Sequence, residues 1–204
     1  HNLWWAWNPR ARELFSALDP KLWEGMGNNP VRMLETVSSE RLLEASENAS
    51  YMNLFGQIFQ QFDKYMDDKT PSPQIGPPDG LKWSSPVAYF STEYGLHDCL
   101  PIYSGGLGTL SGDHLKTASD LNIPLVGVGL LYKNGFFRQV IDKNGAQTAE
   151  YPENDFSRMP LEIVQDDRGD AVQISLELPG RTLFANIWEV HVGRVSLYLL
   201  DTDV

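Results

Sequence analysis

Three glycines, Gly105, Gly106 and Gly108, fall within four positions of the stretch PIYSGGLGTLSGDHLKTASDLNIPLVGVGLLY, directly before a helical pattern. Glycine has no Cβ, so it lets a ligand come close to the backbone. The first N–H groups of a helix have no partner within the helix, and the helix dipole adds positive charge there. A glycine loop at this place is therefore suited to bind a phosphate or a sugar phosphate.

The same glycine pattern is also typical of a tight turn that binds nothing, so both interpretations are open at this point. The loop fits neither common nucleotide-binding fingerprint. GGLGTLSG lacks the Gly-Lys-Ser/Thr of a P-loop. No acidic residue ends a second strand at the spacing that a ribose contact needs.

Other residues near the loop that could do chemistry have structural interpretations that we favour. His114 falls in the apolar sector of the predicted helix, which indicates a core histidine hydrogen-bonded to the backbone rather than a catalytic one. Glu93, His97 and Asp98 precede the loop, but their spacing matches no metal-site pattern. We therefore predict no catalytic residue and no metal site in this chain.

A strand, a helix and a second strand must position the loop. We predict a buried strand at 87–91, a helix at 106–121 and an apolar strand at 125–132, with the strands parallel and the crossover right-handed. The helix is predicted to bury one sector and to point three residues away from it. The inner set is Leu107, Leu110, Ser111, His114, Leu115, Ala118 and Leu121, and the outer set is Lys116, Ser119 and Asp120. Five further strands are predicted at 136–141, 161–164, 173–178, 183–192 and 195–200.

The first part of the chain is predicted to be a small helical bundle. Asp19-Pro20 and Asn29-Pro30 are helix-start signals, and a longer helical pattern begins at Ser39. The aromatic start, LWWAW, resembles a helix already under way and is more typical of core than of a sugar-stacking surface. A proline-rich linker follows, so we divide the chain into a helical segment with linker, 1–84, and an α/β part, 85–204.

Composition excludes several classes of partner. The 204 residues carry a net charge of -11, from 27 acidic and 16 basic residues, which disfavours nucleic acid and anionic membranes. No apolar run approaches a membrane span, and the first residues do not resemble a signal peptide. Cys99 is the only cysteine, so we expect a cytoplasmic protein without an internal disulfide. The chain begins with His1 and ends within a strand pattern, RVSLYLLDTDV, so we expect a fragment of a longer protein.

Long segments of the chain resemble one family. VAYFSTEYGLHDCLPIYSGGLGTLSGDHLKTASDLNIPLVGVGLLYKNGFFRQVID is similar to the glycine-loop region of bacterial and archaeal α-glucan phosphorylases, relatives of glycogen phosphorylase. NLWWAWNPRARELFSALDPKLWEGMGNNPVRML resembles the helical segment that begins shorter members of that family, and LYLLDTDV resembles a strand of their first domain. The resemblance covers essentially the whole chain.

This resemblance implies part of the Rossmann-like N-terminal domain of a GT-B glycosyltransferase fold, preceded by a helical segment. It implies reversible phosphorolysis of α-1,4-glucan by inorganic phosphate to glucose 1-phosphate. It also implies pyridoxal phosphate, held by a lysine of the second domain that has no counterpart here, so the fragment alone should be inactive. In that family the glycine loop faces the substrate and the cofactor phosphate, a role that falls on Gly105, Gly106, Leu107 and Gly108. The oligomeric state is left open, and a homo-oligomer is compatible with the resemblance.

Two alternatives remain open at this point. Glycogen and starch synthases of similar fold carry Lys-Thr before Gly-Gly-Leu, where this chain has Tyr103-Ser104. The missing lysine charge at a sugar-nucleotide site favours the phosphorylase interpretation. A glucan-binding module without chemistry is the other alternative, and the abrupt ends of the chain speak against it.

Overall fold

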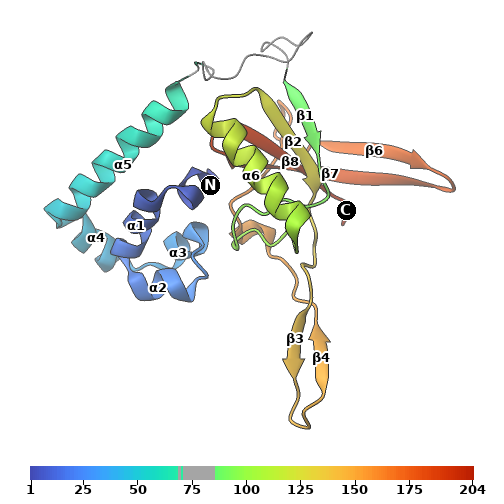
Figure 1. The fold of residues 1–204 in the computed structure, drawn as a ribbon, viewed down its shortest axis with the longest axis horizontal. Coiled ribbons are helices and arrows are strands. Elements are labelled where there is room, and N and C mark those ends of the chain that lie inside the picture. Colours follow the sequence, from blue (N-terminus) through green and yellow to red (C-terminus); the bar gives the residue numbers. More distant parts are fainter. Residues whose placement is uncertain (69, 71–85) are drawn as a thin grey trace.

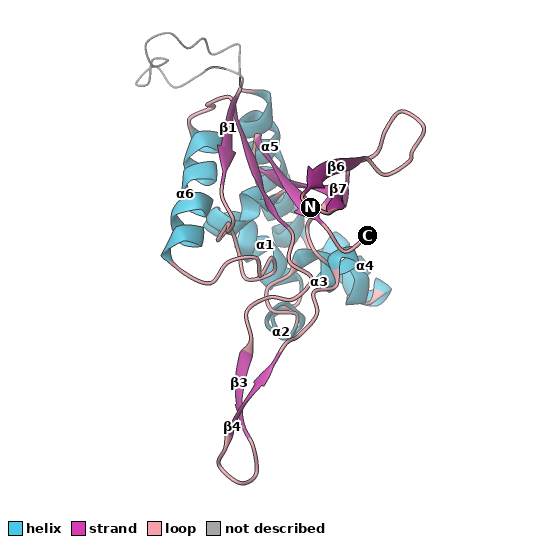
Figure 2. Ribbon diagram, turned by 90° about the vertical axis from the view of Figure 1, so that its right-hand side faces the viewer, coloured by secondary structure: helices cyan, strands magenta, loops and turns pink. Residues whose placement is uncertain are grey.

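A computed structural model describes residues 1–68, 70 and 86–204, and Figure 1 shows their arrangement. The helices of the first part lie beside a mixed sheet, and a two-stranded hairpin projects away from both, as Figure 2 also shows. The proline-rich linker lies almost entirely outside the described residues, and so does the predicted boundary near residue 84. The first part comprises η1 (Leu3–Trp7), α1 (Pro9–Leu18), α2 (Pro20–Gly25), α3 (Pro30–Thr36), α4 (Ser39–Glu47) and α5 (Ala49–Asp67).

Side-chain caps set the starts of these helices. Asp19 accepts a hydrogen bond from the Leu22 N–H and Asn29 from two N–H groups of α3, and proline follows each at the first helical position, as predicted. The long pattern predicted from Ser39 is instead two helices. Asn48 divides them because its side chain accepts from the N–H groups of Ser50 and Tyr51 and so begins α5.

The aromatic start of the chain is part of the core. Leu3, Trp4 and Trp5 are each at most 5% exposed, which confirms the predicted burial. They form a separate 3-10 helix that begins at Asn2, whose side chain accepts from the Trp4 N–H. The same Asn2 side chain exchanges two hydrogen bonds with the Gly193 backbone, at 2.9 and 3.0 Å. The helical segment is therefore fastened directly to the sheet.

The second part is built on a mixed sheet. Its strand order is β1-β2-β8-β7-β5, and β6 pairs with β7. The first three strands of this order are parallel, and the remaining pairs are antiparallel. The elements are β1 (Val87–Phe90), α6 (Gly106–Asp120), β2 (Leu125–Leu130), β3 (Arg138–Ile141), β4 (Gln147–Glu150), η2 (Phe156–Arg158), β5 (Glu162–Ile163), β6 (Gln173–Leu178), β7 (Arg181–Val192) and β8 (Val195–Asp201).

The parallel β1–α6–β2 unit confirms the predicted strand–helix–strand arrangement, but β1 is not a buried strand. It is the edge of the sheet, with Val87 40% and Phe90 73% exposed. Burial alternates along β8, where Val195, Leu197 and Leu199 are buried and their neighbours only half-buried. One face of the parallel strands thus packs into the core, while the other has no comparable cover within the described residues.

The β3–β4 hairpin was predicted only in its first strand. Its second strand, β4, has the short polar sequence QTAE and all four of its residues are exposed, so it carries no apolar alternation to detect. The turn between the two strands contains Gly145 at φ 80°, as the Asn144-Gly145 signal indicates.

Candidate functional site

The glycine loop lies at the start of α6, beyond the carboxyl end of β1. Gly105 caps the helix with extended backbone, φ −155° and ψ −159°, and no side chain in the described part of the chain accepts a hydrogen bond from the first turn. The N–H groups of that turn are consequently left for another partner. The dipole of the 15-residue helix adds positive potential at the same place.

The glycines of this loop fall into two pairs with different surroundings. A Cβ added to Gly105 or Gly106 would meet no atom within 4 Å, and neither residue has a positive φ. A Cβ on Gly108 would collide with the Tyr103 Cβ, and one on Gly112 would collide with the Gly95 carbonyl. The second pair is therefore required by packing, whereas no described residue requires glycine at the first pair.

Backbone and hydroxyl contacts fix the loop to the sheet. The Gly95 N–H donates to the carbonyl of Gly108, in the first turn of α6, at 2.7 Å. The Ser111 hydroxyl, fully buried on the next turn, donates to the Ser91 hydroxyl at 2.9 Å. Tyr94 is also fully buried and donates from its hydroxyl to the Tyr89 carbonyl at 2.7 Å. The end of β1 and the start of α6 therefore form one hydrogen-bonded frame.

Glu93, which the sequence analysis considered only as a metal ligand, contacts the glycine loop. Its carboxylate accepts from the Ser104 hydroxyl at 3.0 Å and from the Ser104 N–H at 3.3 Å. The negative charge thus stands just before Gly105, so an anion bound by the helix start would have to use the N–H groups from Gly105 onward. The contact links two residues eleven positions apart, and no local spacing rule could have indicated it.

The predicted orientation of α6 was partly wrong. Leu107 and Leu110 are 53% and 64% exposed, whereas Ser119, predicted to point outward, is fully buried. Ser119 is buried because its hydroxyl accepts from the Arg194 N–H at 2.8 Å and contacts the Tyr65 hydroxyl. The helix is rotated so that small residues, including Gly108 and Gly112, pack against the frame.

The structure places His114 in other surroundings than predicted. His114 is exposed rather than part of the core, and its ring stacks on Tyr89 at 4.8 Å between ring centroids. His97 is half-buried beside Trp5, and its Nδ1 accepts from the Cys99 N–H at 3.2 Å. Burial lowers the pKa of His97, and it raises the pKa of the Cys99 thiol to about 12. Cys99 is thus a protonated core thiol at neutral pH and not a nucleophile.

Glu93, His97 and Asp98 do not converge. Glu93 binds Ser104, and Asp98 accepts from the Tyr103 hydroxyl at 3.2 Å. Within residues 1–68, 70 and 86–204 there is no group of three or more His, Cys, Asp or Glu side chains that could hold a metal ion. In the same residues, no helix is both long and apolar enough to cross a lipid bilayer.

Comparison with known proteins finds one matching family and several relatives that align with the chain over its whole length. A family described as a protein of unknown function (DUF3417) matches residues 1–100. Over its whole length the chain is 45% identical to maltodextrin phosphorylase of Thermococcus litoralis, 40% to glycogen phosphorylase of Mycobacterium tuberculosis and 37% to glycogen phosphorylase of Aquifex aeolicus. The matched region is 24%, 24% and 28% of those three proteins, so the chain spans about a quarter of their length.

Proposed function

Because the chain belongs to the α-glucan phosphorylase family, matching the N-terminal region of its members from end to end, we propose that the protein containing it is an α-1,4-glucan phosphorylase. Its reaction is the reversible cleavage of a glucan by inorganic phosphate to give glucose 1-phosphate. Residues 85–204 belong to the first Rossmann-like domain of a GT-B fold in this proposal, and 1–84 form a helical segment before it. The active site then lies between this domain and a second one.

We assign the substrate side of that cleft to Gly105, Gly106, Leu107 and Gly108. The single observation that carries the assignment is the open space at Gly105 and Gly106, where an added Cβ would meet no described atom within 4 Å and the backbone has no positive φ. A tight turn that binds nothing would require glycine for its backbone conformation, and these two positions do not. A ligand that approaches the backbone closely would explain why glycine stands at both positions.

Each part of the loop has a defined task in this proposal. The uncapped N–H groups of the first α6 turn stabilise negative charge on a phosphate or on a sugar oxygen in the transition state. Gly108 allows Tyr103 to pack closely, and Glu93 positions the loop through Ser104. Glu93 also keeps an anion away from the Ser104 N–H, because two negative charges within hydrogen-bonding range would repel each other.

The same donors fit a cofactor that presents a phosphate. Pyridoxal phosphate, bound to a lysine of the second domain, would supply a phosphate group for this reaction. The residues of this chain do not hold that cofactor covalently in our proposal. They would contribute oriented N–H groups to a phosphate.

A sugar-nucleotide synthase is the second candidate, and the site disfavours it. A diphosphate ligand would need positive charge beside the glycines, whereas this chain has Tyr103 and Ser104 there, with the Glu93 carboxylate bound to Ser104. The absence of a fixed positive charge at Tyr103-Ser104 weakens diphosphate binding.

The test uses the full-length polypeptide. Maltodextrin and inorganic phosphate should yield glucose 1-phosphate, with one pyridoxal phosphate per chain measured by absorbance. Release of a nucleoside diphosphate from a sugar nucleotide, without pyridoxal absorbance, would support the synthase instead.

A further inference from the structure

The side chain of Tyr103 fills the space between the two segments that carry the glycine loop. A Cβ built on Gly108 would collide with the Tyr103 Cβ and lie 3.2 Å from its Cγ, and a Cβ built on Gly95 would lie 3.0 Å from the ring. The Gly95 N–H donates to the Gly108 carbonyl at 2.7 Å, so the two glycines belong to one joint. The Tyr103 ring therefore packs against the start of α6 and against the segment after β1 at the same time.

The hydroxyl group of Tyr103 holds the ring in this orientation. It donates to the Asp98 carboxylate at 3.2 Å. Asp98 is exposed, but the next two residues, Cys99 and Leu100, are 7% and 0% exposed. The backbone at Asp98 is thus anchored in the core, and its carboxylate is an acceptor at a fixed place.

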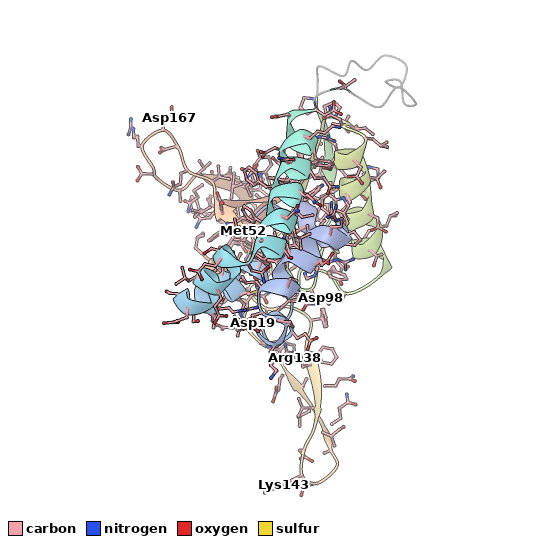
Figure 3. All side chains as sticks on the ribbon, turned by 90° about the vertical axis from the view of Figure 1, so that its left-hand side faces the viewer. Asp19, Met52, Asp98, Arg138, Lys143 and Asp167 are labelled. Carbon is pink, nitrogen blue, oxygen red and sulfur yellow. The ribbon has the colours of Figure 1, made fainter. Side chains whose placement is uncertain are left out.

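The segment that carries Asp98 is held in turn by the helices of the first part. His97 lies beside Trp5 of η1, with 4.6 Å between the ring centroids, and its Nδ1 accepts from the Cys99 N–H at 3.2 Å. Figure 3 shows Asp98 close to these helices, and Asp98 lines a cavity together with the turn between α2 and α3. Contacts therefore lead from the first residues of the chain to the ring of Tyr103.

The glycines of the loop need such a support. A Cβ at Gly105 or Gly106 would meet no described atom within 4 Å, so these residues gain little order from packing. Glycine also allows more backbone conformations than other residues, and its N–H group keeps one direction only where neighbouring contacts select it. Glu93 supplies one such contact through Ser104, and the Tyr103 ring supplies the packing.

We propose that Tyr103 is a positioning residue for the phosphorolysis, an inference that rests on the function proposed above. The ring, held by Asp98, sets the direction of the N–H groups at the start of α6 and acts through them rather than on the ligand. The helices of the first part contribute to catalysis in the same way, because they hold the segment that carries Asp98. An error of about 1 Å in the position of such donors costs on the order of 10²-fold in rate.

The main experiment compares Tyr103→Ala, Tyr103→Phe and Tyr51→Ala in the full-length protein. Tyr51 is the matched control, because it is also a half-buried tyrosine packed on the core but stands on α5, next to Met52 in Figure 3. Tyr103→Ala should raise the KM for inorganic phosphate at least about threefold and lower kcat/KM for phosphate at least about tenfold, with the KM for maltodextrin within about twofold of the parent. Tyr103→Phe keeps the ring and should recover most of this loss, and Tyr51→Ala should leave both KM values unchanged.

The contact with Asp98 gives a second test that does not depend on removing the ring. Asp98→Ala changes an exposed side chain, so the protein should fold even if Tyr103→Ala does not. It removes the same hydrogen bond as Tyr103→Phe. Each single variant and the double variant should therefore lower kcat/KM for phosphate by the same factor, about two- to fivefold.

The order of the loop can also be measured without turnover. Amide hydrogen exchange in residues 93–110, followed by mass spectrometry, should be at least about tenfold faster in Tyr103→Ala than in the parent, and Tyr51→Ala should match the parent. Equal exchange and an equal KM for phosphate in Tyr103→Ala would overturn the inference, and so would losses that add in the double variant. A lower kcat with both KM values unchanged would indicate only a smaller folded fraction and would also count against it.

Failure of the proposed function would give a different result. A parent protein without phosphorolysis would refute that function, and the amide exchange would still decide whether Tyr103 orders the loop.

Discussion

Replacing Gly106 by alanine in the full-length enzyme separates ligand binding from folding. The new methyl group meets no atom of the described residues within 4 Å, and the residue lies in the first turn of α6 without a positive φ. The folding free energy should therefore stay constant or improve by up to ~1 kcal/mol, because alanine loses less backbone entropy than glycine on folding. The methyl group would nevertheless occupy the space that a phosphate or sugar needs beside the backbone.

The expected loss in catalysis is much larger than any change in stability. Displacing one oriented backbone donor costs ~2–4 kcal/mol of transition-state stabilisation, which lowers turnover about 30- to 1000-fold. The assay measures the initial rate of glucose 1-phosphate formation and the melting temperature on the same preparation. A substantial loss of rate at an unchanged melting temperature is the expected result.

Gly108→Ala is the matched control, two residues along the same helix. Its methyl group would collide with the Tyr103 Cβ and approach the Glu93 carboxylate at 3.1 Å, so it should destabilise the fold by ~1–3 kcal/mol. Near-normal turnover in Gly106→Ala would refute the assignment of the glycine pair to ligand binding. Early melting of Gly106→Ala with normal turnover would show that the pair serves the fold.

Three further predictions concern the cofactor, pH and the joint between the two parts. Residues 1–204 alone should give no stoichiometric adduct when incubated with pyridoxal phosphate and reduced with borohydride, and one specific lysine adduct in the mass spectrum would contradict the domain assignment. Burial lowers the pKa of His97 below its ordinary 6.5, so the stability that it contributes is present above pH 6.5 and is lost as the pH falls through the lower native pKa. Between pH 7 and pH 5, chemical denaturation should therefore show a smaller loss of unfolding free energy for His97→Gln than for the parent protein. An equal loss in both would exclude His97 as the cause. Arg194→Met should destabilise the protein by ~1–3 kcal/mol in the same assay. The Arg194 guanidinium donates to the Tyr65 and Ser119 carbonyls at 2.6 and 2.8 Å and lies 3.8 Å from the centre of the Tyr65 ring. An unchanged denaturation midpoint would mean that these contacts contribute no net stability.

The helix starts and the parallel strand–helix–strand unit could be predicted because their signals are local. Asp19 and Asn29, each followed by proline, identify their own helices without any tertiary information. Asn48 carries the same capping chemistry but lacks the proline, and it stands inside an apolar pattern that continues on both sides, so the break at that residue was missed.

Exposure could not be predicted in the same way, because it depends on neighbours distant in the sequence. Val87 and Phe90 form an apolar strand, and only the strand order places them at an edge. The predicted buried face of α6 differs from the observed one because a helical wheel counts glycine and serine as neither apolar nor polar. The actual contact face is made of such residues, since Gly108 and Gly112 let the helix approach the Tyr103 and Gly95 segments closely.

The outcome at α6 gives the glycine loop a consistent physical interpretation. Small residues turn toward the frame, and this leaves Leu107 and Leu110 exposed beside the uncapped N–H groups of the first turn. Under the proposed function, a second domain closing over these leucines would bury apolar surface and exclude water from the loop. Backbone donors act more strongly on a phosphate in such a water-poor site than they do in solvent. Under the proposed function, the exposed leucines and the open glycines would be two requirements of one closing cleft, and both would be unnecessary in a module that only binds glucan on its surface.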